Sequence, residues 1–588
     1  MRHNVPNLPS RRSFLKALAT AGLSSLYWPA FALDLGAEIF AGKHAVTAGS
    51  GGGCFLCQAA QGLQFSNNVV SRPTRPAEFA SFLDAATTAA NTGQSTASVA
   101  QSQAQGETII VQPGWVLVPE GERLNLLSDY DVVIKDDRIE DVRPRKPGRD
   151  KRLPAEGQIL LPGFISGHTH SAAGTMTRGF IEENSFAQVQ GDDPTLPGMS
   201  LLRPMVLMED LSDEELDDLT ALNLAEMLRS GCTTQVEMSL SLKQMKSYVR
   251  VASRFGIRGY PAGMVPGMSR LMAIWGRSDD QVLLDSVPDT LHEIEANLQY
   301  ARTINGTQNG RISPMMGPSV VPVHTRETFK AIRNAANELG NGIHLHIQAG
   351  WSQLTRSALE RYWGMREIEI VRHLGLLDIK LFAAHCMGID LEKDLPIMAA
   401  SSNFTFAHCP SAAGAGVLPS SQPYPEALAA GVNTSIGLDT HSNDYLENIK
   451  LAVMQGRARA QLLGSSSPVP MVEPTIWHGL KSATMGGARG LGREDLGRIE
   501  PGAKADLCTI DVSGLLVGNG TAPRSPYNNL LYANGLSVRN VMTDGNWQVL
   551  DGKFTFGEAS QFIARGGAVV RKVWAQLEAE GFFVTMPR

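Results

Sequence analysis

Leu160-Leu-Pro-Gly-Phe-Ile-Ser-Gly-His168-Thr-His170 is the stretch from which the rest of this sequence is best understood. An apolar run ends there in two histidines that are separated by one residue. Successive side chains of a β-strand alternate between its two faces, so His168 and His170 point the same way, about 6–7 Å apart. Two imidazoles on one face at the end of a strand can bind one metal ion. The stretch therefore predicts half of a metal site.

Three later stretches have the same form. They are Gly-Ile-His344-Leu-His346-Ile, Phe-Ala-Ala-His385-Cys and Ser-Ile-Gly-Leu-Asp439. In each, a short apolar run ends in a nitrogen or oxygen ligand. Imidazole together with carboxylate suits zinc, iron or manganese better than calcium or magnesium. We therefore expect one divalent metal, zinc in the first place, with iron or manganese as alternatives.

The middle of the chain alternates strand-like runs with helical patterns. A capping box at Ser212-Asp-Glu-Glu215 opens one helix, and apolar spacing predicts helices over Thr325–Leu339 and Tyr445–Leu463. Eight strands alternating with helices indicate an α/β protein with a (β/α)8 TIM barrel, whose catalytic residues lie at the C-terminal ends of the strands. The candidate ligands follow strands one, five, six and eight. The expected strands begin at Ile159, Cys232, Gly256, Arg311, Gly342, Ile379, Asn403 and Val432.

Short strand signals flank this middle part on both sides, and the two blocks are expected to pair into one small β-sandwich. A helical pattern then covers Ser560–Glu580. The expected organisation is a signal peptide over 1–32, a low-complexity extension over 33–106, the two parts of the sandwich over 107–158 and 498–556, the barrel over 159–497 and a helical tail over 557–588.

The first 32 residues have the pattern of an export signal. Arg11-Arg12 lies in a twin-arginine motif, an apolar stretch follows, and Ala30-Phe31-Ala32 is typical of a cleavage site. We expect a periplasmic or secreted protein that the twin-arginine export machinery recognises. No apolar run approaches the roughly 20 residues of a membrane span. Cys54 and Cys57 form a CxxC without a second pair, which favours a local disulfide or an inert pair over a zinc site.

Composition restricts the remaining classes. The 588 residues are 43% hydrophobic and 19% charged, enough for a large core. A net charge of −6, from 52 basic and 58 acidic residues, argues against a nucleic-acid-binding protein. We therefore expect a small-molecule substrate and no membrane partner, and homo-oligomerisation stays open.

The candidate residues have distinct expected roles. Asp439 ends strand eight without a neighbouring basic residue, so it can contact the metal and accept the proton of the attacking water. His385 is a ligand or the group that orients water or substrate. His344, on the face of His346, is a second ligand or a support and is counted among the substrate-binding candidates. His408, in His-Cys-Pro-Ser, is expected at the pocket wall as a hydrogen-bond donor to substrate.

These stretches resemble the amidohydrolase superfamily, in particular its branch of triazine hydrolases and cytosine and guanine deaminases, over roughly residues 107–556. The resemblance implies a metal-dependent (β/α)8 barrel with a split β-sandwich and usually one zinc or iron. It aligns His168, His170, His346 and Asp439 with the family's ligands, and His385 with its orienting histidine. Besides the histidine stretches it rests on Arg178-Gly179, Gly231-Cys-Thr-Thr, Gly437-Leu-Asp439 with Ser442-Asn443, Ala483-Thr and Gly497-Arg-Ile-Glu-Pro-Gly-Ala-Lys-Ala-Asp506-Leu.

One departure from the family pattern affects the expected reaction. The deaminases of this branch carry a glutamate three residues after the strand-five histidine, and here that position is Ala349. Alanine cannot transfer a proton to a ring nitrogen. We therefore expect an exported hydrolase that cleaves a C–N bond of an amide, urea or related group. The alternatives are an aminohydrolase of a nucleobase-like or triazine heterocycle, and a metal-binding barrel without activity.

Overall fold

The computed structural model describes residues 108–148, 151–178, 203–275, 279–349, 353–414, 421–521 and 524–580. The expected signal peptide, the extension after it and the Cys54/Cys57 pair lie outside these residues. Within the described ranges, no helix has both the length and the apolar character that a membrane crossing needs.

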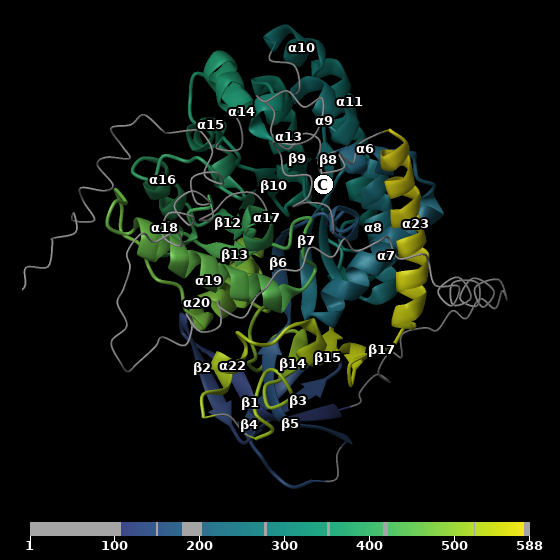
Figure 1. Cartoon of the computed structure of the whole chain (residues 1–588), viewed down its shortest axis with the longest axis vertical. Coiled ribbons are helices and arrows are strands. Elements are labelled where there is room, and N and C mark those ends of the chain that lie inside the picture. The colour runs from purple at the N-terminus through teal and green to yellow at the C-terminus, as the bar shows by residue number, and fades with distance from the viewer. Residues whose placement is uncertain are drawn as a thin grey trace, which may run out of the picture. The chain divides into compact units, whose positions relative to one another are not determined.

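Eight parallel strands form two four-stranded sheets, in the orders β6-β7-β8-β9 and β10-β11-β12-β13 (Figure 1). Nearly all their residues are buried, as in parallel sheets that helices cover. The strands are β6 Phe164–Thr169, β7 Cys232–Ser239, β8 Arg258–Val265, β9 Gly317–Pro318, β10 Ile343–His346, β11 Leu381–Ala384, β12 Phe404–His408 and β13 Thr434–Ile436.

Isolated parallel bridges join the two sheets at both edges. Val320 after β9 pairs with His346 of β10, and Thr169 of β6 pairs with Asp439 after β13. One apolar cluster contains Ile165 of β6 and Phe382 of β11. Because these residues come from different sheets, the cluster lies between the sheets. The order of the strands along the chain is the one expected for a (β/α)8 barrel.

Two predicted strands differ from the observed ones. The run that was expected to begin at Ile159 is divided, because its residues 159–162 pair antiparallel with β14 and only the part from Phe164 enters the parallel sheet. Pro162 has no backbone N–H to continue the ladder. The strand expected from Arg311 is reduced to β9, Gly317–Pro318, with isolated bridges at Ile312 and Met316. Pro314 and Pro318 interrupt pairing there for the same reason.

Helices connect the strands. The capping box at Ser212 and Glu215 is confirmed, and the helices expected over 325–339 and 445–463 are α13 and α19. The longer helices are α7 Asp213–Arg229, α8 Leu242–Phe255, α9 Met268–Trp275, α11 Val287–Ile304, α13 Arg326–Leu339, α15 Glu367–His373, α16 Asp394–Ala400, α19 Tyr445–Leu463 and α23 Ala559–Ala579. The shorter ones are α5 Gly174–Thr177, α6 Arg203–Leu207, α10 Asp280–Asp285, α12 Thr307–Gly310, α14 Gln353–Ala358, α17 Pro410–Gly414, α18 Tyr424–Ala429, α20 Ile476–Lys481, α21 Gly487–Leu491 and α22 Pro526–Asn529.

The two flanking blocks form one nine-stranded sheet, in the order β17-β16-β15-β14-β5-β1-β3-β4, with β2 paired to β1 (Figure 1). The expected pairing of the blocks is thus present, through β5 and β14, while the sandwich itself stays a prediction. The strands are β1 Thr108–Glu120, β2 Arg123–Ser128, β3 Tyr130–Lys135, β4 Arg138–Pro144, β5 Lys151–Pro162, β14 Leu507–Asp511, β15 Val538–Thr543, β16 Asn546–Leu550 and β17 Lys553–Phe554.

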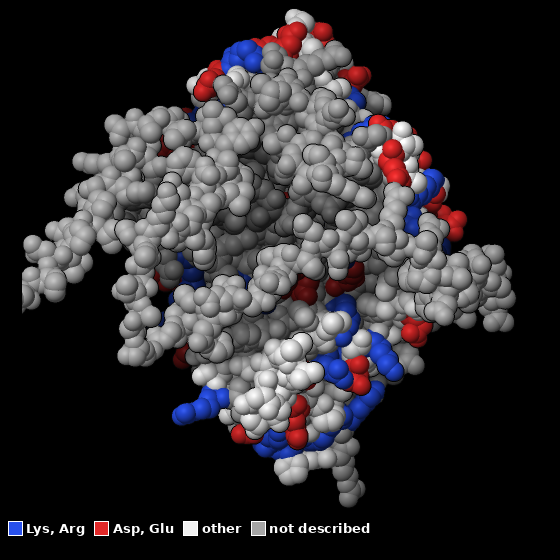
Figure 2. Space-filling view, viewed as in Figure 1, with Lys and Arg blue, Asp and Glu red and all other residues white. Residues whose placement is uncertain are grey.

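The long C-terminal helix α23 lies along α7 (Figure 1). Lys572 contacts Glu215 across this interface, and Val573 and Leu577 are buried. On the described part of the face drawn in Figure 2, basic and acidic side chains are interspersed.

Candidate metal centre

Three histidines from distant parts of the chain meet at the C-terminal ends of the parallel strands. His168 and His170 come from β6 and its end, and His346 is the last residue of β10. One ligand nitrogen from each lies within 4.8 Å of the other two, and Nε2 of His346 is 3.3 Å from Nε2 of His170. All three side chains are buried. The predicted ligands are therefore brought together.

Backbone carbonyl groups fix the orientation of two of these rings. Nδ1 of His170 donates to the Met238 carbonyl at 2.6 Å, and Nδ1 of His346 donates to the Ser319 carbonyl at 2.7 Å. A neutral imidazole that carries its proton on Nδ1 has only a lone pair on Nε2. Two Nε2 lone pairs thus face each other across 3.3 Å. A cation between them removes this repulsion, and such carbonyl partners are typical of metal-binding histidines.

His344 lies behind His168 rather than beside His346. Nε2 of His344 and Nδ1 of His168 are 2.7 Å apart, and both residues are fully buried. With the proton on Nδ1 of His168, its Nε2 is free to bind a metal, and that atom is buried with no hydrogen-bond partner among the described residues. This geometry gives His344 the role of a support.

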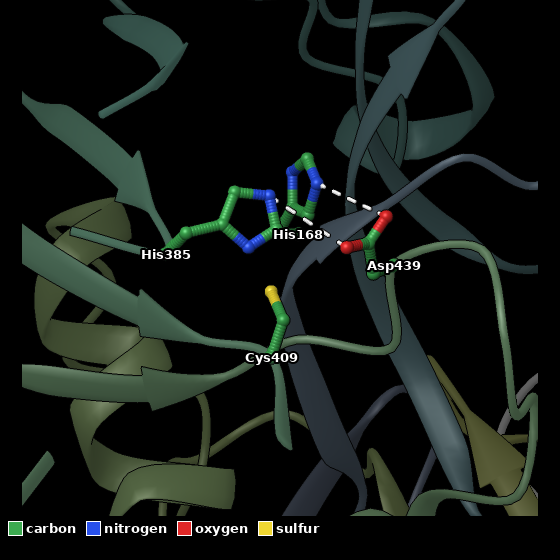
Figure 3. Close-up of side chains that lie close together, drawn as sticks. All are labelled: His168, His385, Cys409 and Asp439. Atoms are coloured by element: carbon green, nitrogen blue, oxygen red, sulfur yellow. Dashed lines mark ion pairs between the residues drawn. The ribbon is translucent and has the colours of Figure 1, made fainter. Parts of the chain in front are cut away.

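Asp439 presents its two carboxylate oxygens to different imidazoles (Figure 3). Oδ1 lies 3.7 Å from Nε2 of both His168 and His170, and Oδ2 lies 3.6 Å from Nε2 of His385. Burial raises the pKa of this carboxyl group. The interactions with His168, His385 and His170 lower the pKa by more than burial raises it, so the net pKa is well below its usual range. Asp439 is therefore ionised and lies between the three-histidine group and His385.

Backbone conformation is unusual at the same points. His385 and Asp439 have φ of 71° and 57°, in the left-handed region that residues with a Cβ rarely adopt. Such conformations persist where the surrounding structure enforces them, and they are concentrated at functional sites. Both side chains are turned into the site by the segment that directly follows a strand.

Gln422 connects the two remaining candidate histidines. Its Oε1 accepts a 2.9 Å bond from Nδ1 of His408, and its Nε2 lies 3.5 Å from Nδ1 of His385. This arrangement places the proton of His385 on Nε2, which faces Asp439. Nε2 of His408 is buried without a partner among the described residues. Because Nδ1 carries the proton, Nε2 can only accept a hydrogen bond, and the donor role expected for His408 does not fit this arrangement. No sequence pattern indicated Gln422, which lies before α18, 14 residues after His408 and 37 residues after His385.

The histidines are neutral at physiological pH. Burial lowers the pKa of His168, His170, His346 and His385, although Asp439 opposes the effect. Neutral imidazole is the form that binds a metal. Four neutral rings, one ionised carboxylate and converging lone pairs fit a divalent cation held by His168, His170, His346 and Asp439.

Two further residues belong to the centre, and the sequence analysis had assigned neither to it. Sγ of Cys409 lies within 4.8 Å of ligand atoms of His168, His385 and Asp439 (Figure 3). Burial raises its pKa well above the usual value, so it is a neutral thiol. Glu237 of β7 accepts hydrogen bonds from the backbone N–H of Ser171, at 3.0 and 3.2 Å, and so fixes the turn after His170. Burial raises the pKa of Glu237 to about 7.

Known proteins are similar to this chain in sequence and in fold. The family model described as "Amidohydrolase family" matches residues 159–548. A protein of Pelotomaculum thermopropionicum named 5-methylthioadenosine/S-adenosylhomocysteine deaminase is 28% identical over 418 residues, which are 68% of this chain and 84% of that protein. A 5'-deoxyadenosine deaminase of Methanobrevibacter smithii is 26% identical, over 75% of this chain and 94% of that protein.

Solved structures with the same fold include a triazine hydrolase from Arthrobacter aurescens, with a TM-score of 0.64 and 20% identity over 79% of this chain and 99% of that one. An adenosine deaminase from Xanthomonas campestris has a TM-score of 0.61 and 21% identity, over 80% and 99% of the two chains. Family and relatives make the chain a metal-dependent hydrolase that acts on C–N bonds, and they favour the deaminase alternative over amide or urea hydrolysis. With its model matched from residue 159 to residue 548, the chain belongs to the amidohydrolase family.

Proposed function

We propose that this protein is a metal-dependent aminohydrolase that removes the amino group from a heterocycle of the adenine-nucleoside type. The observation that carries the hydrolytic part is the convergence of three histidine nitrogens beside the ionised Asp439. The names of the relatives support the class of substrate. Zinc is the metal we favour, since the Xanthomonas campestris adenosine deaminase was solved with bound zinc.

The residues divide the chemistry between them. The metal, held by His168, His170, His346 and Asp439, would lower the pKa of a bound water from about 15.7 towards 7. Asp439 accepts a proton from the attacking water and later delivers it to the leaving nitrogen. His385, with its proton on Nε2, donates a hydrogen bond toward the reacting group.

Supporting residues hold this arrangement. His344 keeps His168 in its metal-binding tautomer, and Gln422 aligns His385 with His408. The unpaired Nε2 of His408 accepts a hydrogen bond from the substrate. The eight parallel strands that carry these residues form a closed barrel, with the isolated bridges between its two sheets as seams.

An assay of ammonia release tests the proposal. Purified, metal-loaded protein is incubated with 5'-methylthioadenosine, S-adenosylhomocysteine and 5'-deoxyadenosine, and in parallel with aminotriazines, cytosine and guanine. We expect ammonia from at least one adenine nucleoside. Turnover of amides or ureas without ammonia release from any of the heterocycles would instead establish the second candidate function, which the alanine at position 349 favours.

Export by the twin-arginine pathway is the second part of the proposal, and it rests on the Arg11-Arg12 motif and the Ala30-Phe31-Ala32 site. Replacement of both arginines by lysine keeps the charge but removes the recognised address. We expect the precursor of the doubly substituted protein to stay in the cytoplasm. Its normal appearance in the periplasm in a cell-fractionation assay would contradict export by this route.

A further inference from the structure

A buried carboxyl group lies beside the loop that follows β10, and the metal centre does not use it. Glu367 begins α15, and its Oε2 accepts a 2.6 Å hydrogen bond from the backbone N–H of Ala349. Ala349 is three residues after the site residue His346. The second oxygen, Oε1, is buried and has no hydrogen-bond partner among the described residues. The carboxyl group is thus anchored through one oxygen while the other is available.

This carboxyl group borders a cavity between the loops that follow β10 and β11. The cavity has a volume of about 340 Å³ and is lined by Ala349 and Glu367 together with Gly388 and Ile389. Ala349 lies in the loop after β10, and Gly388 lies in the loop after β11, three residues beyond His385. The cavity is therefore placed between the loops of two strands whose ends supply site histidines. Its volume falls within the range of small-molecule sites, about 300–1,000 Å³.

The surroundings keep Glu367 protonated at neutral pH. Burial raises its pKa to about 8, although the backbone N–H groups of Ala349 and Gln348 oppose the effect and nearby Asp394 of α16 adds to it. Of the two arginines that line the cavity, Arg356 and Arg366, the second pairs with Asp394 and with Glu369, at 3.0 Å in each case. On the β11 side, the buried thiol of Cys386 is close enough for Glu367 to raise its pKa. A carboxyl group with a pKa close to the working pH is suited to general acid catalysis.

We propose that Glu367 is the acid–base catalyst of the reaction and that its carboxyl group enters from α15 in place of a side chain at position 349. This inference rests on the proposed function. Deamination of an aminated ring requires a proton on the adjacent ring nitrogen, and Ala349 cannot supply it. Glu367 is anchored to the backbone of that same residue, so the missing group is replaced from a different helix.

Two carboxyl groups, those of Asp439 and Glu367, account for every proton transfer in the reaction. Water adds to the carbon that bears the amino group, Asp439 takes one of its protons, and Glu367 gives its proton to the ring nitrogen. Asp439 then protonates the amino group, the C–N bond breaks, and ammonia leaves. The remaining hydroxyl proton passes to Glu367 as the carbonyl forms, so that both carboxyl groups regain their starting states. The sum is heterocyclic amine plus water giving lactam plus ammonia.

Glu367→Gln tests this role, because glutamine still accepts the Ala349 N–H but cannot exchange a proton. We expect kcat/KM for ammonia release from 5'-deoxyadenosine, or from whichever nucleoside the unsubstituted enzyme deaminates, to fall about 100-fold or more. The decline of activity above pH 8 should disappear, while metal content stays unchanged. Glu327→Gln is the matched control: Glu327 is exposed in the first turn of α13 and does not line the cavity, so its substitution should leave kcat/KM within about twofold.

Thermal melting provides a readout that is independent of activity. The folded protein keeps the Glu367 proton up to about pH 8, whereas the unfolded chain loses it near pH 4.5. Between these values the unfolded state binds fewer protons, so stability falls as the pH rises. Glu367→Gln should show a shallower decline of the melting temperature from pH 5 to pH 8.

Three results would overturn the inference. They are near-normal kcat/KM in Glu367→Gln with the same decline above pH 8, loss of bound metal in that variant, and an unchanged slope of melting temperature against pH. If the unsubstituted enzyme releases no ammonia from any heterocycle, the proposed function is refuted together with this inference. This outcome differs from failure of the inference alone, because it is observed before any residue is substituted. Return of ammonia release in the double variant Glu367→Gln/Ala349→Glu would support the inference directly, since the carboxyl group would then come from position 349.

Discussion

Two buried clusters of charged and polar side chains in this protein differ in how their buried charges are balanced. Between the parallel strands and the nine-stranded sheet, Arg258 binds Asp506 at 2.8 Å and Asp544 at 3.1 Å. Arg311 and Lys504 approach Asp544 at 3.1 and 2.8 Å. Each buried carboxylate there meets a cation supplied by the chain.

The metal centre has no such internal balance. Asp439 faces imidazoles that are neutral because burial lowers their pKa, and their nitrogen lone pairs converge. Burial of a charge is costly unless it is paired. The first cluster is complete and therefore structural. In the second, only histidines pair with Asp439 among the described residues, and the cluster is arranged for a metal cation. This difference separates a stabilising cluster from a functional one.

Of the tests of this difference between the two clusters, removal of the metal should have the largest effect on activity. Dialysis against a chelator is expected to abolish activity, and addition of zinc to restore it, because the converging ligands are completed only by a cation. Elemental analysis of the purified protein should give about one divalent metal per chain, as one set of four ligands requires. Full activity of metal-free protein would contradict the assignment of the centre.

Asp439→Asn should reduce turnover by about 10²–10⁴-fold, or more if metal is also lost, because the amide keeps the shape but cannot accept the proton of water. Steady-state kinetics and metal content, measured together, separate these two causes. A circular dichroism spectrum like that of the unsubstituted protein serves as the folding control. Turnover within a few-fold of the unsubstituted enzyme would show that another group is the base.

Arg258→Met should lower the free energy of unfolding and leave catalysis unchanged. The substitution leaves Asp506 and Asp544 buried with fewer partners, and loss of one member of a buried pair costs about 3–5 kcal/mol. Denaturant unfolding measures this loss, and activity per folded, metal-loaded molecule should be unchanged. A large loss of catalysis in fully folded protein would show that the two clusters are coupled.

His344→Asn should produce a smaller change confined to the metal centre. Without the imidazole behind it, His168 loses the partner that fixes its tautomer, and such supports contribute about 10–100-fold in metal affinity. A competition titration with a zinc-binding dye measures the change. His292→Asn is the control, because that histidine is in α11 and has no contact with the centre among the described residues.

Glu122→Gln should have the smallest effect, because its partners Arg489 and Lys481 are on the surface. These hydrogen bonds lower the pKa of Glu122 to about 2, so its contribution is present above pH 4.5 and is lost as the pH falls to about 2. Exposed pairs contribute up to about 1 kcal/mol, reduced further by salt. Unfolding at pH 7 and pH 3 measures this. A loss of unfolding free energy as large as that of Arg258→Met would contradict the expected difference between buried and exposed ion pairs.

Much of the metal centre could be predicted from the sequence because its residues follow a local rule. Each ligand comes directly after a short apolar run, and the C-terminal ends of parallel strands meet at one face. His168, His170, His346, His385 and Asp439 were found in this way. Glu237, Gln422 and Glu367 could not be, because they act through contacts between segments far apart along the chain.

The sequence by itself determined which residues are the candidate metal ligands, since strand alternation and apolar runs are local properties that hold in any context. It also determined that position 349 has no carboxyl group. Only the tertiary structure decided that His344 supports His168, that a lone pair on each ligand faces the same point, and that Glu367 reaches Ala349 from another helix. These are contacts across tens of residues, and they exist only after strands and helices have packed together and excluded water.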